Sequence, residues 1–303
     1  MSRSLRVVAA ATLALLAACS TPQGGRGEDE RAAPGEEAIS RIVRAHNARV
    51  DRIDSLWARV SARVRGLDAR GERFEEQGEG HLQIDPPRSV SLSIGKLGET
   101  YFAYGADAER YWMIDLTNDD RRTALTGALD RVTRRKARAI GLSVHPSELT
   151  AVLGIEPLDP DAIDSARWVG AKGTLALTTA SRWGSIEYGF DTRRGVPTWV
   201  RILDDGAETI ARAELSAYTP MRSRLGLDED VRVPGTVAIT TPRDADGYLR
   251  LGISSPTIKP INGVVFDFER LSRLYRVDEV IDLDEDVDWS APPAEPLRAA
   301  PER

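Results

Sequence analysis

The chain has 303 residues, of which 41% are hydrophobic and 29% charged, and its net charge at pH 7 is −6. An acidic chain lacks the basic face expected of a general nucleic-acid binder, so we expect no nucleic-acid partner. The one cysteine cannot form an internal disulfide, so the core alone must hold the fold, and about 250 ordered residues bury enough surface to do so.

The N-terminal stretch MSRSLRVVAAATLALLAAC has the parts of an export signal. Arg3 and Arg6 form a basic start, residues 7–18 form an apolar run, and small residues precede Cys19. The run is shorter than the roughly 20 apolar residues that cross a bilayer. The sequence therefore predicts a secretory leader rather than a membrane-spanning helix.

LAAC, at the end of this leader, resembles the lipobox of bacterial lipoproteins. The resemblance implies a signal peptide over residues 1–18, removed before Cys19, and lipid such as palmitate attached to that cysteine. Removal of the leader takes the net charge from −6 to −8. Ser20, where aspartate would resemble an inner-membrane retention signal, favours an outer-membrane anchor facing the periplasm. The alternative is an ordinary secretory leader with a chance cysteine.

Composition divides the rest of the chain into a tether, a domain and a tail. Residues 19–35 are rich in Gly, Pro and charge, which is typical of a flexible tether. Residues 290–303 have the same character and are expected to be disordered, which leaves one domain over residues 36–289.

The domain begins with apolar residues at helical spacing, which predicts an amphipathic helix. Arginines fall mostly between the apolar positions and give the predicted helix a basic face that could contact anionic lipid. The residues at three- and four-residue steps are Ile39, Ile42, Val43, His46, Val50, Ile53, Leu56 and Trp57.

After this helix the apolar residues recur at every second position, which predicts strands at 58–65, 73–84, 88–96, 100–105 and 111–116. Short turns join them, so they must form an antiparallel meander. The clearest is 88–96, where Val90, Leu92 and Ile94 point to one face and serines to the other.

Helices are expected in the middle of the chain, over 121–142 and 145–155. In the second, Pro146 suits a first helical turn and Gly154 a C-cap. Seven further strands are expected at 173–180, 183–191, 195–205, 207–218, 235–242, 247–254 and 263–269.

This order of elements resembles the LolA/LolB-like family of envelope lipoprotein carriers and receptors over residues 36–287. The motifs that carry the resemblance are a strand ending in proline (Gly80–Pro87), a strand facing the cavity (Arg88–Lys96), and a turn before an aromatic pair (Gly105–Trp112). That turn, ADAER, lacks the Asp-Gly pair common in the family, and the helical insert over 121–141 is longer and more basic than expected.

The resemblance implies an α+β fold. A strongly curved antiparallel sheet of about 11–12 strands forms an unclosed half-barrel, with helices covering its concave face and acyl chains or lipoproteins held inside. The alternating apolar residues are the candidate cavity lining. They are Val60, Val64, Leu82, Ile84, Val90, Leu92, Ile94, Trp112, Ile114, Leu175, Leu177, Ile186 and Tyr188.

Catalytic and metal signatures are not found in the sequence. The three histidines fall in different predicted elements, and neither a zinc motif, a nucleophile elbow nor a P-loop occurs. Acidic residues alternate over 282–288, but the glycine and final acid of a calcium loop are missing, which favours a solvated acidic end.

We therefore expect a monomeric binding protein that is not an enzyme and has no metal or cofactor. The leading hypothesis is a membrane-anchored lipid- or lipoprotein-handling module. The alternatives are a structural or sensory envelope lipoprotein with a filled core, and an uncharacterised hydrolase. Alternation alone does not show whether the interior is open or filled.

Overall fold

A computed structural model describes residues 33–67, 73–87, 89–139, 144–170, 173–182, 184–223, 226–242, 244–285 and 287. The predicted leader, Cys19, most of the tether and the C-terminal tail lie outside the described residues, so these parts of the domain division stay predictions. Within the described ranges no helix is long and apolar enough to cross a membrane.

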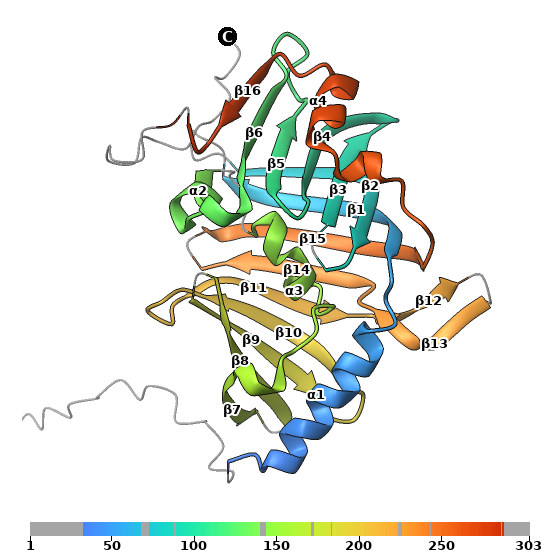
Figure 1. The fold of residues 1–303 in the computed structure, drawn as a ribbon, viewed down its shortest axis with the longest axis vertical. Coiled ribbons are helices and arrows are strands. Elements are labelled where there is room, and N and C mark those ends of the chain that lie inside the picture. The colour runs from blue at the N-terminus through green and yellow to red at the C-terminus, as the bar shows by residue number, and fades with distance from the viewer. Residues whose placement is uncertain are drawn as a thin grey trace, which may run out of the picture.

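One curved sheet of sixteen strands makes up most of the molecule (Figure 1). Its strands are β1 (Leu56–Leu67), β2 (Arg73–Asp85), β3 (Ser89–Lys96), β4 (Glu99–Ala106), β5 (Arg110–Asp115), β6 (Thr123–Ala128), β7 (Ile163–Val169), β8 (Thr174–Ser181), β9 (Gly184–Asp191), β10 (Val196–Leu203), β11 (Thr209–Ser216), β12 (Thr219–Ser223), β13 (Gly226–Val233), β14 (Thr236–Thr241), β15 (Asp244–Thr257) and β16 (Glu279–Asp282).

The sheet is open. Its order runs β16-β6-β5-β4-β3-β2-β1-β15-β14-β11-β10-β9-β8-β7, with β12 and β13 off this path. The pairs are antiparallel except β16 with β6 and a single bridge between β12 and β15. This confirms the predicted half-barrel, although it has sixteen strands rather than 11–12.

The helices are short and lie against this sheet. They are α1 (Glu36–Val50), α2 (Arg134–Ala139), α3 (Leu149–Val152) and α4 (Phe268–Tyr275), with 3-10 turns η1 (Leu129–Arg131), η2 (Pro146–Glu148), η3 (Pro160–Ala162) and η4 (Gly263–Phe266). In Figure 1, α1 runs beside the part of the sheet that ends in β7, and α3 lies over its middle.

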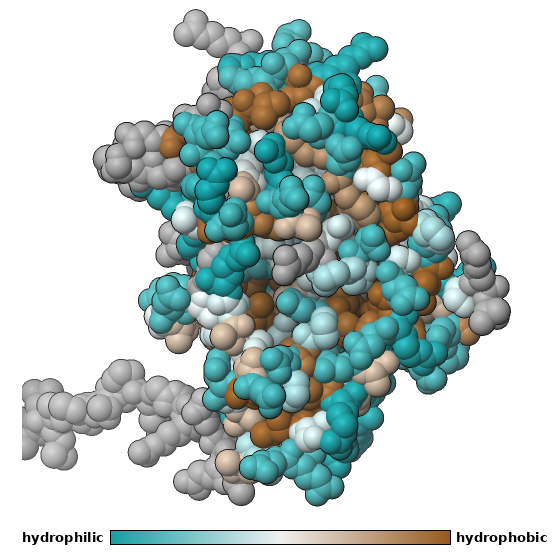
Figure 2. Space-filling model, viewed as in Figure 1, coloured by the Kyte–Doolittle hydropathy of each residue, from teal (hydrophilic) through white to brown (hydrophobic). Residues whose placement is uncertain are grey.

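The stripe predicted for the first helix is buried in α1 only as far as Val50, where the helix ends; Leu56 and Trp57, predicted to be helical, instead lie in β1 and pair with β2. The predicted basic face is also only partly as expected. Ile42, Val43, His46 and Val50 are buried. Arg41 and Arg44 are exposed, whereas Arg49 is buried. Polar residues cover the outer face of α1 in the space-filling view (Figure 2).

Two elements predicted from local composition are wrong. Residues 123–128, expected to be helical, form β6 because they pair with β5 on one side and with β16 on the other. Residues 263–269, expected to be a strand, form η4 and the start of α4, whose N-cap Asp267 accepts a hydrogen bond from the Arg270 N–H at 3.0 Å.

The acidic end is not fully solvated, which corrects the prediction. Asp284 has only 1% of its side chain exposed and pairs with the Nζ of Lys136. Its carboxylate also accepts a hydrogen bond from the Ala128 N–H at 2.7 Å. These contacts lower the pKa of Asp284 against the opposing effect of burial, and they join β16 to α2. Among the described residues no group of acids or histidines could hold a metal ion.

Candidate functional site

Most of the predicted lining residues lie together on the concave face of the sheet. Ten of them belong to one buried apolar cluster: Val60, Leu82, Ile84, Val90, Leu92, Ile94, Leu175, Leu177, Ile186 and Tyr188. Val64 is half-buried, nearer the free end of β1.

Trp112 and Ile114 are the exception, and their assignment to the cavity is corrected. They lie on the convex face, in a second cluster with Phe266, Phe268 and Leu271. The rings of Trp112 and Phe268 have centroids 6.2 Å apart. The neighbours of Trp112 in β5, Tyr111 and Met113, are the ones that pack on the concave side.

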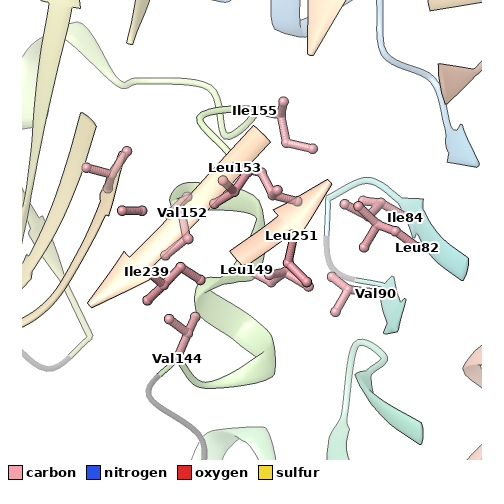
Figure 3. Packing of buried hydrophobic residues seen from close by; sticks show 14 of the residues in the cluster. Leu82, Ile84, Val90, Val144, Leu149, Val152, Leu153, Ile155, Ile239 and Leu251 are labelled. Carbon is pink, nitrogen blue, oxygen red and sulfur yellow. The ribbon is translucent and has the colours of Figure 1, made fainter. Parts of the chain in front are cut away.

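The half-barrel interior is filled by residues 144–158, which we name the plug segment. Its apolar side chains pack against residues of β2, β3, β14 and β15, including Leu82, Val90, Ile239 and Leu251 (Figure 3). The plug residues buried in this cluster are Val144, Leu149, Ala151, Val152, Leu153, Ile155 and Leu158.

Polar side chains of α1 hold the C-terminal part of the plug segment. The Asn47 side chain donates to the Leu158 carbonyl at 2.7 Å and accepts from the Leu158 N–H at 2.8 Å. Arg49 donates to the Gly154 carbonyl at 2.5 Å and to the Arg232 carbonyl at 2.8 Å. These bonds between α1 and the plug segment are made by side chains rather than by strand pairing.

His46 belongs to the same set of contacts. Its Nε2 lies 2.7 Å from the Glu156 carbonyl and therefore donates to it, while Nδ1 lies 3.2 Å from Arg49. Burial, and then the charge of Arg49, lower the pKa of His46 to about 3. The imidazole is therefore neutral, which matches one donating and one accepting nitrogen.

The N-terminal part of the plug segment is held by η2. The Tyr104 hydroxyl donates to the Val144 carbonyl. His145 and Glu148 form a capping box, in which the Glu148 carboxylate accepts from the His145 N–H at 3.2 Å. Burial raises the pKa of Glu148 to about 7, although Arg134 lies 3.8 Å away.

A cleft of about 560 Å³ opens between the plug segment and β8 and β9. Its apolar wall includes Val90, Leu129, Ile186 and Tyr188. At its rim Arg182 donates to the Leu129 carbonyl and so connects the two ends of the curved sheet.

Two polar groups in this cleft have no polar partner among the described residues. Tyr188 is 1% exposed, and its hydroxyl makes no hydrogen bond within that part of the chain. The Glu156 carboxylate makes neither a hydrogen bond nor an ion pair there, and burial raises its pKa. Glu156 in turn raises the pKa of Tyr188, as expected of groups that lie close together.

Sequence reasoning identified Tyr188 as a lining residue but missed Glu156 and the role of the plug. The helical spacing of Leu149, Val152 and Leu153 was a usable signal, because a short apolar helix between two strand sets must be covered by one of them.

Comparison with known proteins gives a likeness of fold. No protein-family model and no curated protein matches the chain. A LolA superfamily protein from Nitrosomonas europaea has a TM-score of 0.46 at 13% identity and covers 76% of this chain and 98% of its own. A DUF1329 family protein from Desulfovibrio piger has a TM-score of 0.46 at 11% identity and covers 79% and 100%.

The stronger likeness is to a domain from Vibrio parahaemolyticus that is named for outer membrane lipoprotein sorting. Its TM-score is 0.51 at 12% identity, and the match covers 79% of this chain and all of that domain. The chain therefore shares its fold with this domain.

Proposed function

We propose that this chain is a lipid-anchored envelope protein that binds acyl chains, or the acyl chains of lipoproteins, inside its half-barrel and performs no covalent chemistry. The observation that carries the proposal is the plug segment. An apolar concave face that extends over most of the sheet is covered there by fifteen residues held by side-chain hydrogen bonds. The lipobox and the fold likeness support the same function.

Binding of an acyl chain in place of the plug exchanges one apolar cover of the concave face for another. An acyl chain that replaces the plug covers the same apolar side chains, at about 25 cal/mol per Å² removed from water. The plug's contacts with α1 must be given up, and each hydrogen bond contributes about 1 kcal/mol net. Binding is therefore favourable when the surface that the acyl chain covers outweighs both the apolar plug surface that becomes exposed and the lost hydrogen bonds.

A second function is favoured by the packing itself. Leu149, Val152 and Leu153 are buried as completely as core residues, so a structural or sensory envelope protein with a permanently filled interior has the same structure. The two functions differ in whether the plug moves.

Hydrolase chemistry is less well supported. Ser147 lines the cleft and its hydroxyl lies 2.8 Å from Nδ1 of His145. However, burial lowers the pKa of His145 to about 3, and the same Nδ1 accepts the Ser147 N–H as a helix cap. An imidazole with so low a pKa is a poor general base near neutral pH.

The test is photo-crosslinking of the full lipidated chain in lipid nanodiscs that contain a phospholipid with a photoreactive acyl chain. We expect crosslinks on concave residues such as Leu92 and Leu177. Asn47→Ala, which loosens the plug, should raise their yield roughly thirtyfold, because two hydrogen bonds that oppose binding, worth about 2 kcal/mol together, are lost. Leu92→Trp with Leu177→Trp should lower the yield by filling volume.

Asn118→Ala is the matched control, because Asn118 accepts turn hydrogen bonds at an exposed site away from the plug. It should leave the crosslinking unchanged. If the folded native chain gives no concave crosslinks, and Asn47→Ala lowers stability without creating any, the filled-core alternative replaces the carrier function.

A further inference from the structure

The cleft beside the plug segment has the composition of a site for a polar head group. One wall is apolar, with Val90, Leu129 and Ile186, and the opposite side presents Glu148 and Glu156 from the plug. With the plug segment in place, an amphiphile would lie in this cleft with its acyl chain on the apolar wall and its head group beside Glu148 and Glu156.

The polar groups around this cleft lack partners of the kind that a ligand could supply. The Tyr188 hydroxyl and the Glu156 carboxylate make no hydrogen bond among the described residues, although Tyr188 is almost fully buried. The Oε1 atom of Glu148 is also buried without a hydrogen bond. The Glu148 oxygen lies 3.8 Å from Arg134, whereas the Tyr188 hydroxyl and the half-buried Glu156 carboxylate are left free to accept hydrogen bonds from a bound donor.

The charge of the residues that line the cleft indicates which kind of head group it would bind. Among the lining residues that the structure describes, Asp130, Glu148, Glu156 and Asp159 are acidic and Arg182 is basic. Arg182 is already engaged with the Leu129 carbonyl. An anionic head group would be repelled by the acidic majority of this lining, whereas a protonated amine could donate to its carboxylates.

Resting on the function proposed above, we propose that this cleft is a subsite for the primary amine of an amphiphile, which donates hydrogen bonds to the Glu156 carboxylate and the Tyr188 hydroxyl. The amphiphile's acyl chains would continue along the concave face. A quaternary amine has no N–H to donate, so the subsite would distinguish lipids of identical chains by their head groups.

The experiment uses the full chain in phosphatidylcholine nanodiscs with either photoreactive phosphatidylethanolamine or photoreactive phosphatidylcholine, with identical acyl chains. We expect the ethanolamine lipid to crosslink at least fivefold more strongly. Glu156→Gln should bring this ratio close to one, and Tyr188→Phe should reduce it about threefold, because each removes one acceptor while keeping the size of the side chain. Asp205→Asn, the same charge change at an exposed turn, should leave the ratio unchanged.

The outcomes separate this subsite from the proposed function. Absence of crosslinking by both lipids would overturn acyl binding itself. Equal crosslinking by the two lipids, or a preference that survives in Glu156→Gln, would overturn only the amine subsite. Soluble ethanolamine, which lacks acyl chains, should compete weakly; competition as strong as that of the lipid would overturn the assignment to an amphiphile.

Discussion

Glu148 is a carboxyl group whose proton affinity changes when the chain folds. Burial raises its pKa from 4.5 to about 7, so between these values the folded state binds more protons than the unfolded state. Its contribution to stability is therefore most favourable below about pH 4.5 and is lost as the pH rises through 7. His46 and His145 act in the opposite direction, because their lowered pKa values favour the unfolded state as the pH falls below 6.5.

Glu148→Gln isolates this effect. The glutamine keeps the size and can still accept the His145 N–H, but it does not ionise. Relative to the native chain, the variant should gain about 3 kcal/mol of unfolding free energy between pH 4.5 and pH 8. Both histidines are present in both proteins, so their effects cancel in the difference. Denaturant unfolding at the two pH values measures it, and a difference that does not change with pH would contradict the assigned burial of Glu148.

At the scale of elements, α4 covers residues of β5 that would otherwise be candidates for the lining of the half-barrel cavity. It covers the convex face over β5 and thereby places Trp112 and Ile114 in a core of their own, away from the interior. This helix follows β5 by more than 150 residues, and the stretch FDFE, which leads into it, alternates in a way that suggests a strand.

Two leucines of α4 provide a matched test of this cover. Leu271 is 5% exposed and packs against the convex cluster, whereas Leu274 is 65% exposed. Leu271→Ala should therefore lower the unfolding free energy by about 2–5 kcal/mol, and Leu274→Ala by less than about 0.5 kcal/mol. Chemical denaturation of the two variants compares them directly. Equal losses would mean that α4 is not fixed on the sheet through Leu271.

Elements set by contacts close in the sequence were predicted correctly, whereas elements set by contacts between distant parts of the chain were not. The strand over Val90, Leu92 and Ile94 was predicted with the correct facing because its alternation is local. The strand β6 was missed because its TALTGA sequence contains good helix formers, and its structure depends on pairing with β16. For the same reason the sequence could not show whether the interior is filled, since that depends on where residues 144–158 pack.

At the scale of the whole molecule, the predicted lipid anchor would hold the half-barrel close to the membrane. If the 17 residues from Cys19 to Gly35 form the flexible tether that their composition predicts, its average span is about 23 Å. Such a tether would keep the domain within about its own diameter of the bilayer. An acyl chain could then pass between the membrane and the interior without the protein leaving the surface.

The lipid at Cys19 is therefore expected to be needed for attachment. Cys19→Ala should release the protein from the membrane fraction or stall its processing, because the lipid on this cysteine is the membrane anchor that the sequence predicts. Membrane fractionation and the mass of the mature chain measure both effects. Ser20→Asp is the companion variant, which should keep the lipid but shift the protein toward the inner-membrane fraction. An unchanged membrane fraction and an unchanged mature mass in Cys19→Ala would refute the lipid anchor and leave an ordinary secretory leader as its replacement.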